Sequence, residues 1–432
     1  MEDKPGTSEA AWPSRKLANF ALAVLLLAYV FSFIDRIILS MLVGPIKADL
    51  HLTDTQIALV NGLAFSMFYA TMGLPLGWLV DRTSRKGVVA AGIALWSLVT
   101  AFSGLAKDFG HLFLARMGVG VGEAIGLPGN QSVIADYFPP HKRGFAMSVL
   151  LLAPPVGAFI GFVGGGWIAQ NFDWRWTFAI AAVPGLILGV LVHLFIAEPP
   201  RGQHDADASD DVPTLGDVIR RFIRLPSARH LVIGSTLAAT LGFGLNYFFT
   251  SLMIRRFDLG IGEAGLYAGL IASLPAAISV LASGWLADRW GAKRPSAYAI
   301  IPGICMLIGG PLYALAITRD DLGLLLALVT VSALLQFGYL GITFATLQNM
   351  MHPRMRATAS ALLNAIYAIA GGLGPVILGA MSDSMDPGYG PGEGLAIAMA
   401  LMSGIYLWAG AHYLLAARHI GRDMAAAREG RV

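Results

Sequence analysis

The stretch GWLVDRTSRK at Gly77–Lys86 occurs a second time, in altered form, as GWLADRWGAKR at Gly284–Arg294. The two copies lie 207 residues apart, and each ends a long apolar segment. A second pair of similar stretches, FPPHKRGFAMS and MHPRMRATAS, aligns Pro140 with Pro353 at an offset of 213 residues. Two matches in the same order predict a chain built from two related halves.

The composition predicts an integral membrane protein. Of the 432 residues, 56% are hydrophobic and 13% are charged, and the mean hydropathy is +0.65, which lies outside the balance of soluble globular domains. A membrane-spanning helix needs about 20 apolar residues. We predict an all-α integral membrane fold with twelve transmembrane helices, at 17–43, 55–80, 86–106, 109–135, 142–168, 174–196, 229–255, 262–288, 295–317, 322–349, 356–381 and 394–417.

Lysine and arginine predict the orientation of these spans. Of the 30 such residues, 22 lie in the termini and the even-numbered loops, and six lie on the opposite side. The positive-inside rule then places both termini in the cytoplasm, and the short loops favour a bacterial inner membrane. The other two, Arg36 and Arg116, fall within spans. Because the bases are spread over short loops, we expect no nucleic acid partner.

A polar stretch divides the twelve spans into six and six. We predict an N-terminal six-helix bundle at 1–196, a cytoplasmic linker at 197–228, and a C-terminal six-helix bundle with a cytoplasmic tail at 229–432. The linker is expected to hold a short amphipathic helix around Leu215–Ile223. Cys305 is the only cysteine, which excludes an internal disulfide and a cysteine metal site. The histidines have no metal-ligand spacing, so we expect neither a metal nor a cofactor.

Four charged residues fall within the first and fourth spans. At a rise of about 1.5 Å per residue, Asp35 lies about 7 Å to the outer side of the first span's midpoint, with Arg36 beside it. Arg116 lies roughly 9 Å to the outer side of the fourth span's midpoint, and Glu123 lies close to that midpoint. We therefore expect Asp35, Arg36 and Arg116 at a similar depth, with Glu123 about two helical turns deeper.

Of these four groups only the carboxylates can change charge, because arginine keeps its proton at physiological pH. Burial raises a carboxylate's pKa and a nearby arginine lowers it. We predict Asp35 as the leading protonation site, Arg116 and Arg36 as its switching partners, and Glu123 as a second site or relay. One alternative is a fixed ion-pair cluster that only orients helices. Another is that Arg36 binds an anionic headgroup, since guanidinium suits phosphate and carboxylate.

The second half carries neutral residues where the first carries charges. At the 213-residue offset, Glu123 corresponds to Gln336 and Arg116 to Val329. We therefore predict ion coupling in the first half and an apolar, hydrogen-bonding wall in the second. The alternative for the amides is that they link helices. The candidate substrate-binding residues are Arg36, Arg116, Asn246, Gln336 and Asn364.

The repeated loop resembles the hallmark loop of the major facilitator superfamily, in which a glycine, three residues, Asp-Arg and then Arg-Lys follow the second helix. The resemblance covers the whole chain. It implies two pseudo-symmetric six-helix halves with the binding site between them, and a loop that latches the cytoplasmic gate. The alternative is that its bases only anchor the topology. The candidate gate residues are Gly77, Asp81, Arg82, Arg85, Lys86, Asp288 and Arg289.

Within that superfamily, the segment GVGEAIGLPGNQSVIADYFPPHKRGFAMSV, together with IDR in the first span, resembles the spinster group of lysolipid and sphingosine-1-phosphate transporters. With the buried carboxylates, this resemblance implies a proton-coupled, alternating-access transporter of an amphipathic lysolipid-like anion. The expected partners are membrane lipids, protons and an amphipathic or small anionic substrate. We expect a monomer.

Two other functions fit the sequence less well. An Asp-Arg pair in the first span also occurs in organic-anion symporters, so a sugar-acid symporter is the first alternative. The second is a membrane sensor that binds ligand without moving it. An enzyme is not expected, because the sequence contains no catalytic nucleophile, phosphate-binding loop or set of metal ligands in a suitable context.

Overall fold

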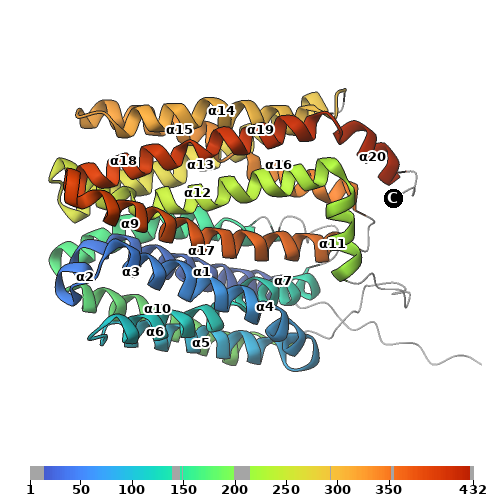
Figure 1. Cartoon of the computed structure of the whole chain (residues 1–432). Helices are drawn as coiled ribbons and strands as arrows, with labels where there is room; N and C mark the ends of the chain where they lie inside the picture. The colour runs from blue at the N-terminus through green and yellow to red at the C-terminus, as the bar shows by residue number, and fades with distance from the viewer. Residues whose placement is uncertain are drawn as a thin grey trace, which may run out of the picture.

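The computed structural model of the chain describes residues 14–138, 146–147, 149–198, 215–291, 293–351 and 355–428. Within these ranges every regular element is a helix, and the long helices run side by side (Figure 1). We refer to residues 14–198 as the first half and to residues 215–428 as the second half. The end of the molecule that holds α11 and α20 is named the inner end, following the predicted orientation, and the opposite end is the outer end.

The first half begins with one long helix and continues through shorter ones. A π-helical turn, η1, lies between α3 and α4. The described helices are α1 (Arg15–Met41), α2 (Val43–Leu50), α3 (Asp54–Leu59), η1 (Val60–Ala64), α4 (Phe65–Arg82), α5 (Arg85–Ser103), α6 (Phe109–Glu123), α7 (Gly126–Tyr137), α9 (Ala153–Asn171) and α10 (Trp174–Phe195).

The second half opens with the amphipathic helix α11, which crosses the inner ends of the longer helices (Figure 1). This confirms the helix predicted in the linker, although the predicted limits of the linker and the two bundles stay predictions. The described helices are α11 (Leu215–Arg224), α12 (Pro226–Phe257), α13 (Ile261–Gly291), α14 (Ala297–Ile317), α15 (Leu322–Gln336), α16 (Tyr339–Met350), α17 (Arg356–Tyr389), α18 (Pro391–Ser403), α19 (Ile405–Ala417) and α20 (Ile420–Arg428).

The backbone repeats the duplication found in the sequence. All four bounds of α6 and α7 recur 213 residues later as the bounds of α15 and α16. The caps recur as well. The Asp108 carboxylate accepts from the backbone N–H of His111 at 2.9 Å, and the Asp321 carboxylate accepts from that of Leu324 at 2.7 Å. Both halves therefore break the same span at the same place.

Nine helical stretches in the described ranges are long and apolar enough to cross a membrane. The other three predicted windows correspond to α3–α4, which contains the π turn, to α6–α7, which is broken after Glu123, and to α9. The window at 142–168 ends early, since α9 covers Ala153–Asn171. The described residues 146–147 and 149–150 of the window are helical as well. The inner part of that window, 142–145 and 148, lies outside the described residues.

Among the spans that are longer than their apolar windows, α12 and α17 show where such a helix ends. α12 continues to Phe257 and α17 continues to Tyr389, past the predicted ends at 255 and 381. Hydropathy marks where a helix leaves the lipid, whereas the helix itself ends where the backbone turns left-handed. Asp258 has φ 53° and Gly390 has φ 82°, and a positive φ stops an α-helix.

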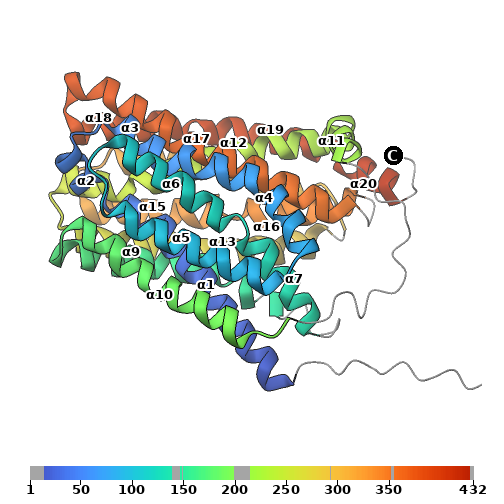
Figure 2. The same cartoon turned by 90° about the horizontal axis from the view of Figure 1, so that it is seen from below.

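The two halves approach each other closely near their middle. Gly62 in η1 lies against Gly372 in α17, where a Cβ would collide with the Gly372 carbonyl oxygen. Neither position tolerates a side chain, and this lets the two backbones touch. Figure 2 shows α17 beside α3 and α4 along this seam. In the described residues, hydrogen bonds between the halves occur from this level outward, for example from the Tyr247 hydroxyl to the Ile57 carbonyl at 3.3 Å.

Candidate functional site

Asp35 and Arg116 form an ion pair that is sealed from solvent. Asp35 on α1 is 1% exposed and Arg116 on α6 is 0% exposed. The Arg116 Nη1 donates to Asp35 Oδ2 at 2.8 Å, and the Thr100 hydroxyl on α5 donates to Asp35 Oδ1 at 2.8 Å. Three helices thus meet at one carboxylate, and both of its oxygens accept hydrogen bonds.

Glu123 and Arg36 form a second pair, which is partly open. The Arg36 Nε donates to Glu123 Oε2 at 2.6 Å, and the Ser32 hydroxyl donates to the same oxygen at 2.9 Å. The side chain of Arg36 is 21% exposed, whereas that of Glu123 is 0% exposed. The Arg36 guanidinium carbon lies 4.7–4.9 Å from the centres of three rings, which hold the cation in place. These rings belong to Phe33, Phe65 and Tyr69.

The structure brings the four predicted charges together, but it pairs them differently. In this state Arg36 pairs with Glu123 and not with Asp35, since each acid has its own arginine. The predicted switching of Arg36 to Asp35 stays a prediction. Consecutive residues on a helix point about 100° apart. Arg36 therefore leaves α1 in another direction from Asp35, and its long side chain reaches Glu123.

Three buried polar atoms at these pairs have no hydrogen-bond partner among the described residues. They are Glu123 Oε1, Arg36 Nη2 and Arg116 Nε. A buried polar group without a partner is costly, so the site has one acceptor and two donors available to water, a proton or a ligand. The free Arg36 Nη2 lies in the partly exposed pair and is the donor that a ligand would reach more readily.

The π turn η1 contributes a further polar contact. It places Asn61, whose side-chain amide oxygen Oδ1 accepts from Arg116 Nη2 at 3.3 Å. π turns inside α-helices occur frequently at functional sites. Sequence reasoning missed Asn61, because no local sequence pattern predicts a π turn. The turn adds one residue to the helix and thereby changes the direction in which the Asn61 side chain points.

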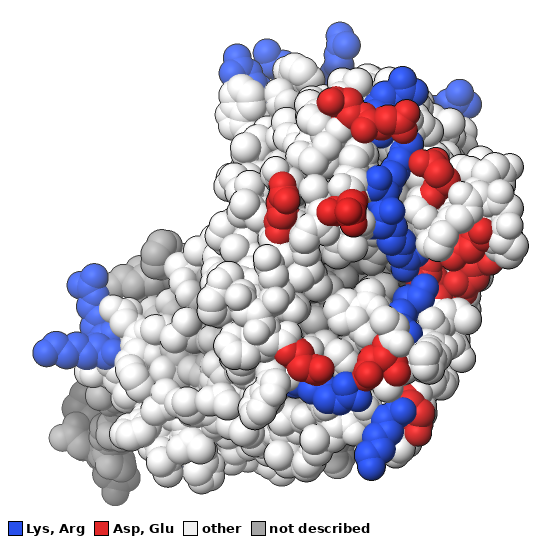
Figure 3. Space-filling view, turned by 90° about the vertical axis from the view of Figure 1, so that its left-hand side faces the viewer, with Lys and Arg blue, Asp and Glu red and all other residues white. Residues whose placement is uncertain are grey.

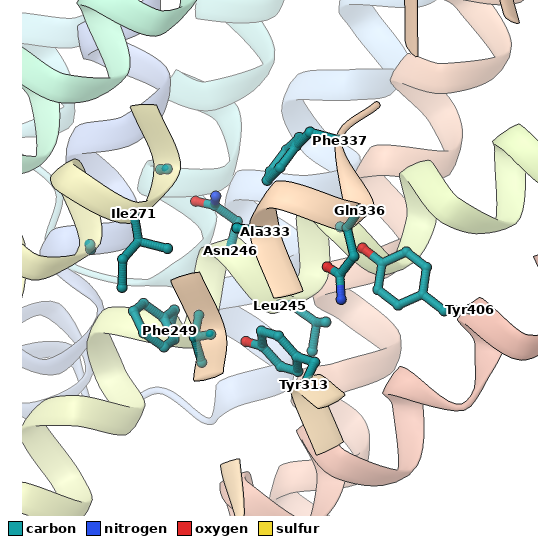
Figure 4. Close-up of a pocket in the computed structure, with 13 residues that line it drawn as sticks. Leu245, Asn246, Phe249, Ile271, Tyr313, Ala333, Gln336, Phe337 and Tyr406 are labelled. Carbon is teal, nitrogen blue, oxygen red and sulfur yellow. The ribbon is translucent and has the colours of Figure 1, made fainter. Parts of the chain in front are cut away.

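The second half has a small apolar cavity at the corresponding depth. Its volume is about 50 Å³, and α12, α13, α14, α15 and α19 line it. Asn246 and Gln336 both belong to this wall, and Figure 4 shows aromatic rings around them. Gln336 Nε2 donates to the Gly309 carbonyl at 3.0 Å and to the Ser332 hydroxyl at 2.6 Å. This contact favours the helix-linking alternative for Gln336. Asn364 is exposed on α17 and is not part of this cavity's lining.

An ion-pair network, here called the outer closure, joins the halves at the outer end. The carboxylate of Asp54 on α3, which is 0% exposed, accepts two hydrogen bonds from the Arg255 guanidinium on α12, both at 2.6 Å. Lys47 and Ser382 contact the same carboxylate. Burial alone would raise the pKa of Asp54, but hydrogen bonding and charge from Arg255, with Lys47, lower it to about 2.

A residue of the second half also caps a helix of the first. The Asp383 carboxylate on α17 accepts from the backbone N–H of Asp54 at 2.9 Å and of Thr55 at 2.8 Å, both at the start of α3. In Figure 3, which views the outer end, basic and acidic side chains interleave across this face. Sequence reasoning missed Asp54 and Asp383, and it counted Arg255 only as one of the six bases on the outer side. No local signal links residues about 200 or more positions apart.

The repeated loops lie at the inner end of α4 and α13. Arg82 stacks on the Trp78 ring at 4.1 Å, and Arg289 stacks on the Trp285 ring at 5.3 Å, so the two copies share a cation–π contact. No described atom lies within 4 Å of the place a Cβ would take at Gly77. Among the described residues, no helix therefore packs closely against this glycine. The side chains of Asp81 and Asp288 lie outside the described ones.

Arg85 is unlike the other predicted gate residues, because it is 3% exposed. Its Nε donates to Glu198 at 3.1 Å, and its Nη1 contacts the Asp136 carboxylate. The backbone N–H groups of Arg85 and Lys86 also donate to Glu198, at 3.1 Å and 3.0 Å. Partial burial raises the pKa of Glu198, but these hydrogen bonds lower it overall. The sequence analysis missed Glu198, which ties α5 to the end of α10.

The sequence pattern of the family described as "Major Facilitator Superfamily" matches residues 25–375. An "MFS-type efflux pump" of Mycolicibacterium smegmatis is 30% identical, over 90% of this chain and 91% of the relative. "Protein spinster homolog 1" of Xenopus tropicalis is 26% identical, over 93% of this chain and 81% of that protein. The "D-galactonate transporter" of Escherichia coli O6:H1 is 26% identical, over 94% of this chain and 96% of that protein.

A solved structure resembles the chain over nearly its whole length. It is a bacterial homologue of the human lysosomal transporter spinster in an "inward-facing and unoccupied conformation". The TM-score is 0.87 and the identity is 28%, covering 95% of this chain and 99% of that one. These similarities confirm the predicted helical fold of two related halves and the resemblance to the spinster group. They also confirm that the chain is not an enzyme, because the relatives and structural neighbours are transporters.

Proposed function

The chain belongs to the Major Facilitator Superfamily of membrane transporters, and from this premise we propose that it is a proton-coupled, alternating-access transporter of an amphipathic lysolipid-like anion. One observation carries the proposal. Two buried carboxylates, Asp35 and Glu123, each face an arginine, and both pairs lie in the first half. Ionisable groups inside a membrane are costly and mark ion or proton pathways.

The coupling follows from which groups can titrate. Arg36 and Arg116 keep their protons, so each pair loses its attraction when its carboxylate becomes neutral. A proton on Asp35 would release Arg116 from α1 and loosen the contact between α1 and α6. Glu123 serves as the relay, since its partner Arg36 is partly exposed and its Oε1 is unpartnered among the described residues.

The same pairs supply the anion site. A phosphate or carboxylate headgroup that reaches Arg36 would use the free Nη2 and compete with Glu123 for the guanidinium, and charge-assisted hydrogen bonds of this kind are strong. Substrate and proton binding are then linked, because neutral Glu123 leaves Arg36 free for the headgroup. Arg116 would assist, and the wall with Asn246 and Gln336 would meet the apolar part. Asn364 on α17 lies outside that wall and stays a separate candidate for substrate binding.

The cavity in the second half bears on the state of the molecule. At about 50 Å³, it is too small for a drug-sized ligand, which needs roughly 300 Å³ or more. The outer closure joins the halves on one side. We propose that this is an inward-facing state, in which the second-half wall has yet to open around an acyl chain.

Two alternatives keep specific support. The D-galactonate transporter among the relatives favours a small organic anion, which would use the arginines but not an apolar wall. A sensor that does not transport has less support, because the repeated inner loops and the charged pairs are both retained. We further propose a monomer in the inner membrane with both termini cytoplasmic, the bundles and linker as predicted, and the loops around Arg82, Arg85, Lys86 and Arg289 as the inner gate.

The test uses the purified protein in liposomes with an imposed pH gradient. Internal pH is followed while a lysolipid, and separately a sugar acid, is offered. Proton movement only with the lysolipid supports the proposal, and movement only with the sugar acid supports the alternative. Proton movement with neither, despite measured ligand binding, would contradict both and favour the sensor.

The variant Asp35→Asn tests the coupling residue, since it removes the titrating group but keeps the shape. We expect it to lose proton-driven accumulation and to retain ligand binding. Asp423→Asn is the matched control, because Asp423 is also buried but accepts hydrogen bonds from Ser227 far from the site. Normal accumulation by Asp35→Asn would rule out Asp35 as the coupling group.

A further inference from the structure

A groove of about 650 Å³ opens between the inner ends of α13 and α14. It is separate from the charged pairs, the small cavity and the outer closure. Its wall is mainly apolar and faces outward: Trp290, Ile300 and Ile304 are 53%, 37% and 46% exposed. Lys293 and Arg294 lie at the inner end of the same groove. The groove therefore combines an apolar channel with two cations at its mouth.

Several bases of the molecule have acidic partners, and within the described ranges these two cations do not. Arg255 and Arg256 at the outer end have acidic partners, and Arg85 does as well. Among the side chains that the structure describes, none forms an ion pair or hydrogen bond with the Lys293 or Arg294 side chain. Both are exposed, so their charge is available to a ligand in the groove.

The turn between α13 and α14 holds the two bases together. The Trp290 carbonyl accepts from the backbone N–H of Lys293 at 3.1 Å and from that of Arg294 at 2.9 Å. Ser296, which also lines the groove, precedes α14, and its hydroxyl makes no capping hydrogen bond. The Lys293 ammonium, the Arg294 guanidinium and the Ser296 hydroxyl thus all belong to the groove's inner end, on a turn held by backbone hydrogen bonds.

We propose that this groove binds an anionic phospholipid of the cytoplasmic leaflet, with its phosphate at Lys293, Arg294 and Ser296 and an acyl chain along α14. Ile300 and Ile304 are four residues apart, so they form one face of the helix and extend the channel from the bases towards the membrane centre. Trp290 lies at the level where indole rings favour the membrane interface.

The chemistry selects this occupant over others. Basic pockets between transmembrane helices on the cytoplasmic side are suited to anionic lipid headgroups. A soluble phosphate would use the bases but leave the apolar wall empty. A zwitterionic lipid would use the wall but gain less from two cations, because its own cation would repel them. The bound lipid is resident and lies outside the proposed transport path.

The experiment measures lipid binding to the intact protein by native mass spectrometry. Protein in detergent is titrated with phosphatidylglycerol or with phosphatidylcholine of the same chains. We expect one phosphatidylglycerol to bind at least tenfold more tightly than phosphatidylcholine. The variant Lys293→Gln/Arg294→Gln should lose most of that preference, whereas Arg15→Gln/Lys16→Gln, which removes the same two charges at the start of α1, should keep it. An unchanged preference in the first variant would overturn the proposal.

A second variant tests the apolar channel without touching the charges. Ile304→Trp should fill the groove and weaken binding of the phospholipid, because packed apolar sites do not accept added volume freely. Millimolar glycerol phosphate should not displace the lipid. If Ile304→Trp binds the lipid normally, or if glycerol phosphate displaces it, the site takes a phosphate group alone and the lipid assignment is wrong. Thermal unfolding in detergent checks that each variant is folded.

Discussion

The segment α6–α7 in the first half and the segment α15–α16 in the second have the same backbone and different chemistry. Both begin with an aspartate cap and break at positions 213 residues apart. Arg116 and Glu123 on α6 hold ion partners on α1. Among the described residues, Val329 and Gln336 on α15 hold none, and the Gln336 amide donates to Gly309 and Ser332 within its own half.

This difference shows that the same backbone can hold charge-dependent contacts in one half and pH-independent contacts in the other. Where charges face each other across helices, the contact can change with a proton, and packing depends on the charge state. Where an amide bonds to a carbonyl and a hydroxyl, the contact is insensitive to pH. We therefore propose that the charge-dependent contacts lie in the first half, while the polar contacts of the second half do not depend on pH.

The largest effect is expected when the first half is made to copy the second at Arg116. Arg116→Val leaves the buried Asp35 carboxylate without its cation, and breaking a buried pair from one side costs about 3–5 kcal/mol. Thermal unfolding in detergent at neutral pH measures the loss. The double variant Asp35→Asn/Arg116→Val should recover a large part of it. If the double variant is no more stable than Arg116→Val, the pairing explanation is wrong.

The reverse exchange, Gln336→Glu, should be the next most damaging. A carboxylate there cannot donate to the Gly309 carbonyl, and no cation lies among the hydrogen-bond partners of Gln336. Placing an acceptor against an acceptor in a buried site costs on the order of 2–3 kcal/mol. Gln336→Met, which removes the hydrogen bonds but adds no charge, is the control. Equal unfolding temperatures for the two variants would contradict this reading.

The outer closure sharpens the comparison because it is an ion pair with a different pH response. The pKa of Asp54 is lowered to about 2 from the ordinary 3.8, so its contribution is present above about pH 4 and is lost as the pH falls towards 2. Asp54→Asn should favour the outward-open state by about 1–3 kcal/mol. A label pair on the outer ends of α3 and α12, read by electron paramagnetic resonance, measures this opening.

The same labels test whether the outer closure senses protons. In the unmodified protein their distance distribution should stay constant between pH 5 and pH 8, because Asp54 remains ionised across that range. An opening within this range that persists in Asp35→Asn would assign the pH response to the outer closure rather than to the buried pairs of the first half.

The smallest effect is expected where the two halves are alike. Arg82→Gln and Arg289→Gln each remove a cation–π contact to Trp78 or Trp285 at an exposed site, which is worth about 0.5–1 kcal/mol. Unfolding temperatures should fall slightly and to a similar degree in both variants. A large loss from only one of them would show that the two copies of the loop have different structural roles.

The sequence alone predicted most of the fold and the four charges of the site. Long apolar windows predict spanning helices because lipid leaves the backbone no other way to satisfy its hydrogen bonds. Asp35, Arg36, Arg116 and Glu123 were identifiable because a charge in such a window is rare. Gln336 was identified as the neutral counterpart of Glu123 from the repeat offset, and the backbone bears that correspondence out.

Only the tertiary structure decided which charges pair. Asp35 and Arg36 are neighbours in the chain, yet they serve different partners, since adjacent side chains on a helix diverge and Arg36 is long enough to reach Glu123. The π turn that brings Asn61 to Arg116, the closure of Asp54 by Arg255, and the capping of α3 by Asp383 depend on contacts between distant segments. The local sequence pattern predicts which residues are buried and how deep they lie in the membrane. Which acid pairs with which arginine depends on where two helices meet, and no local pattern predicts that.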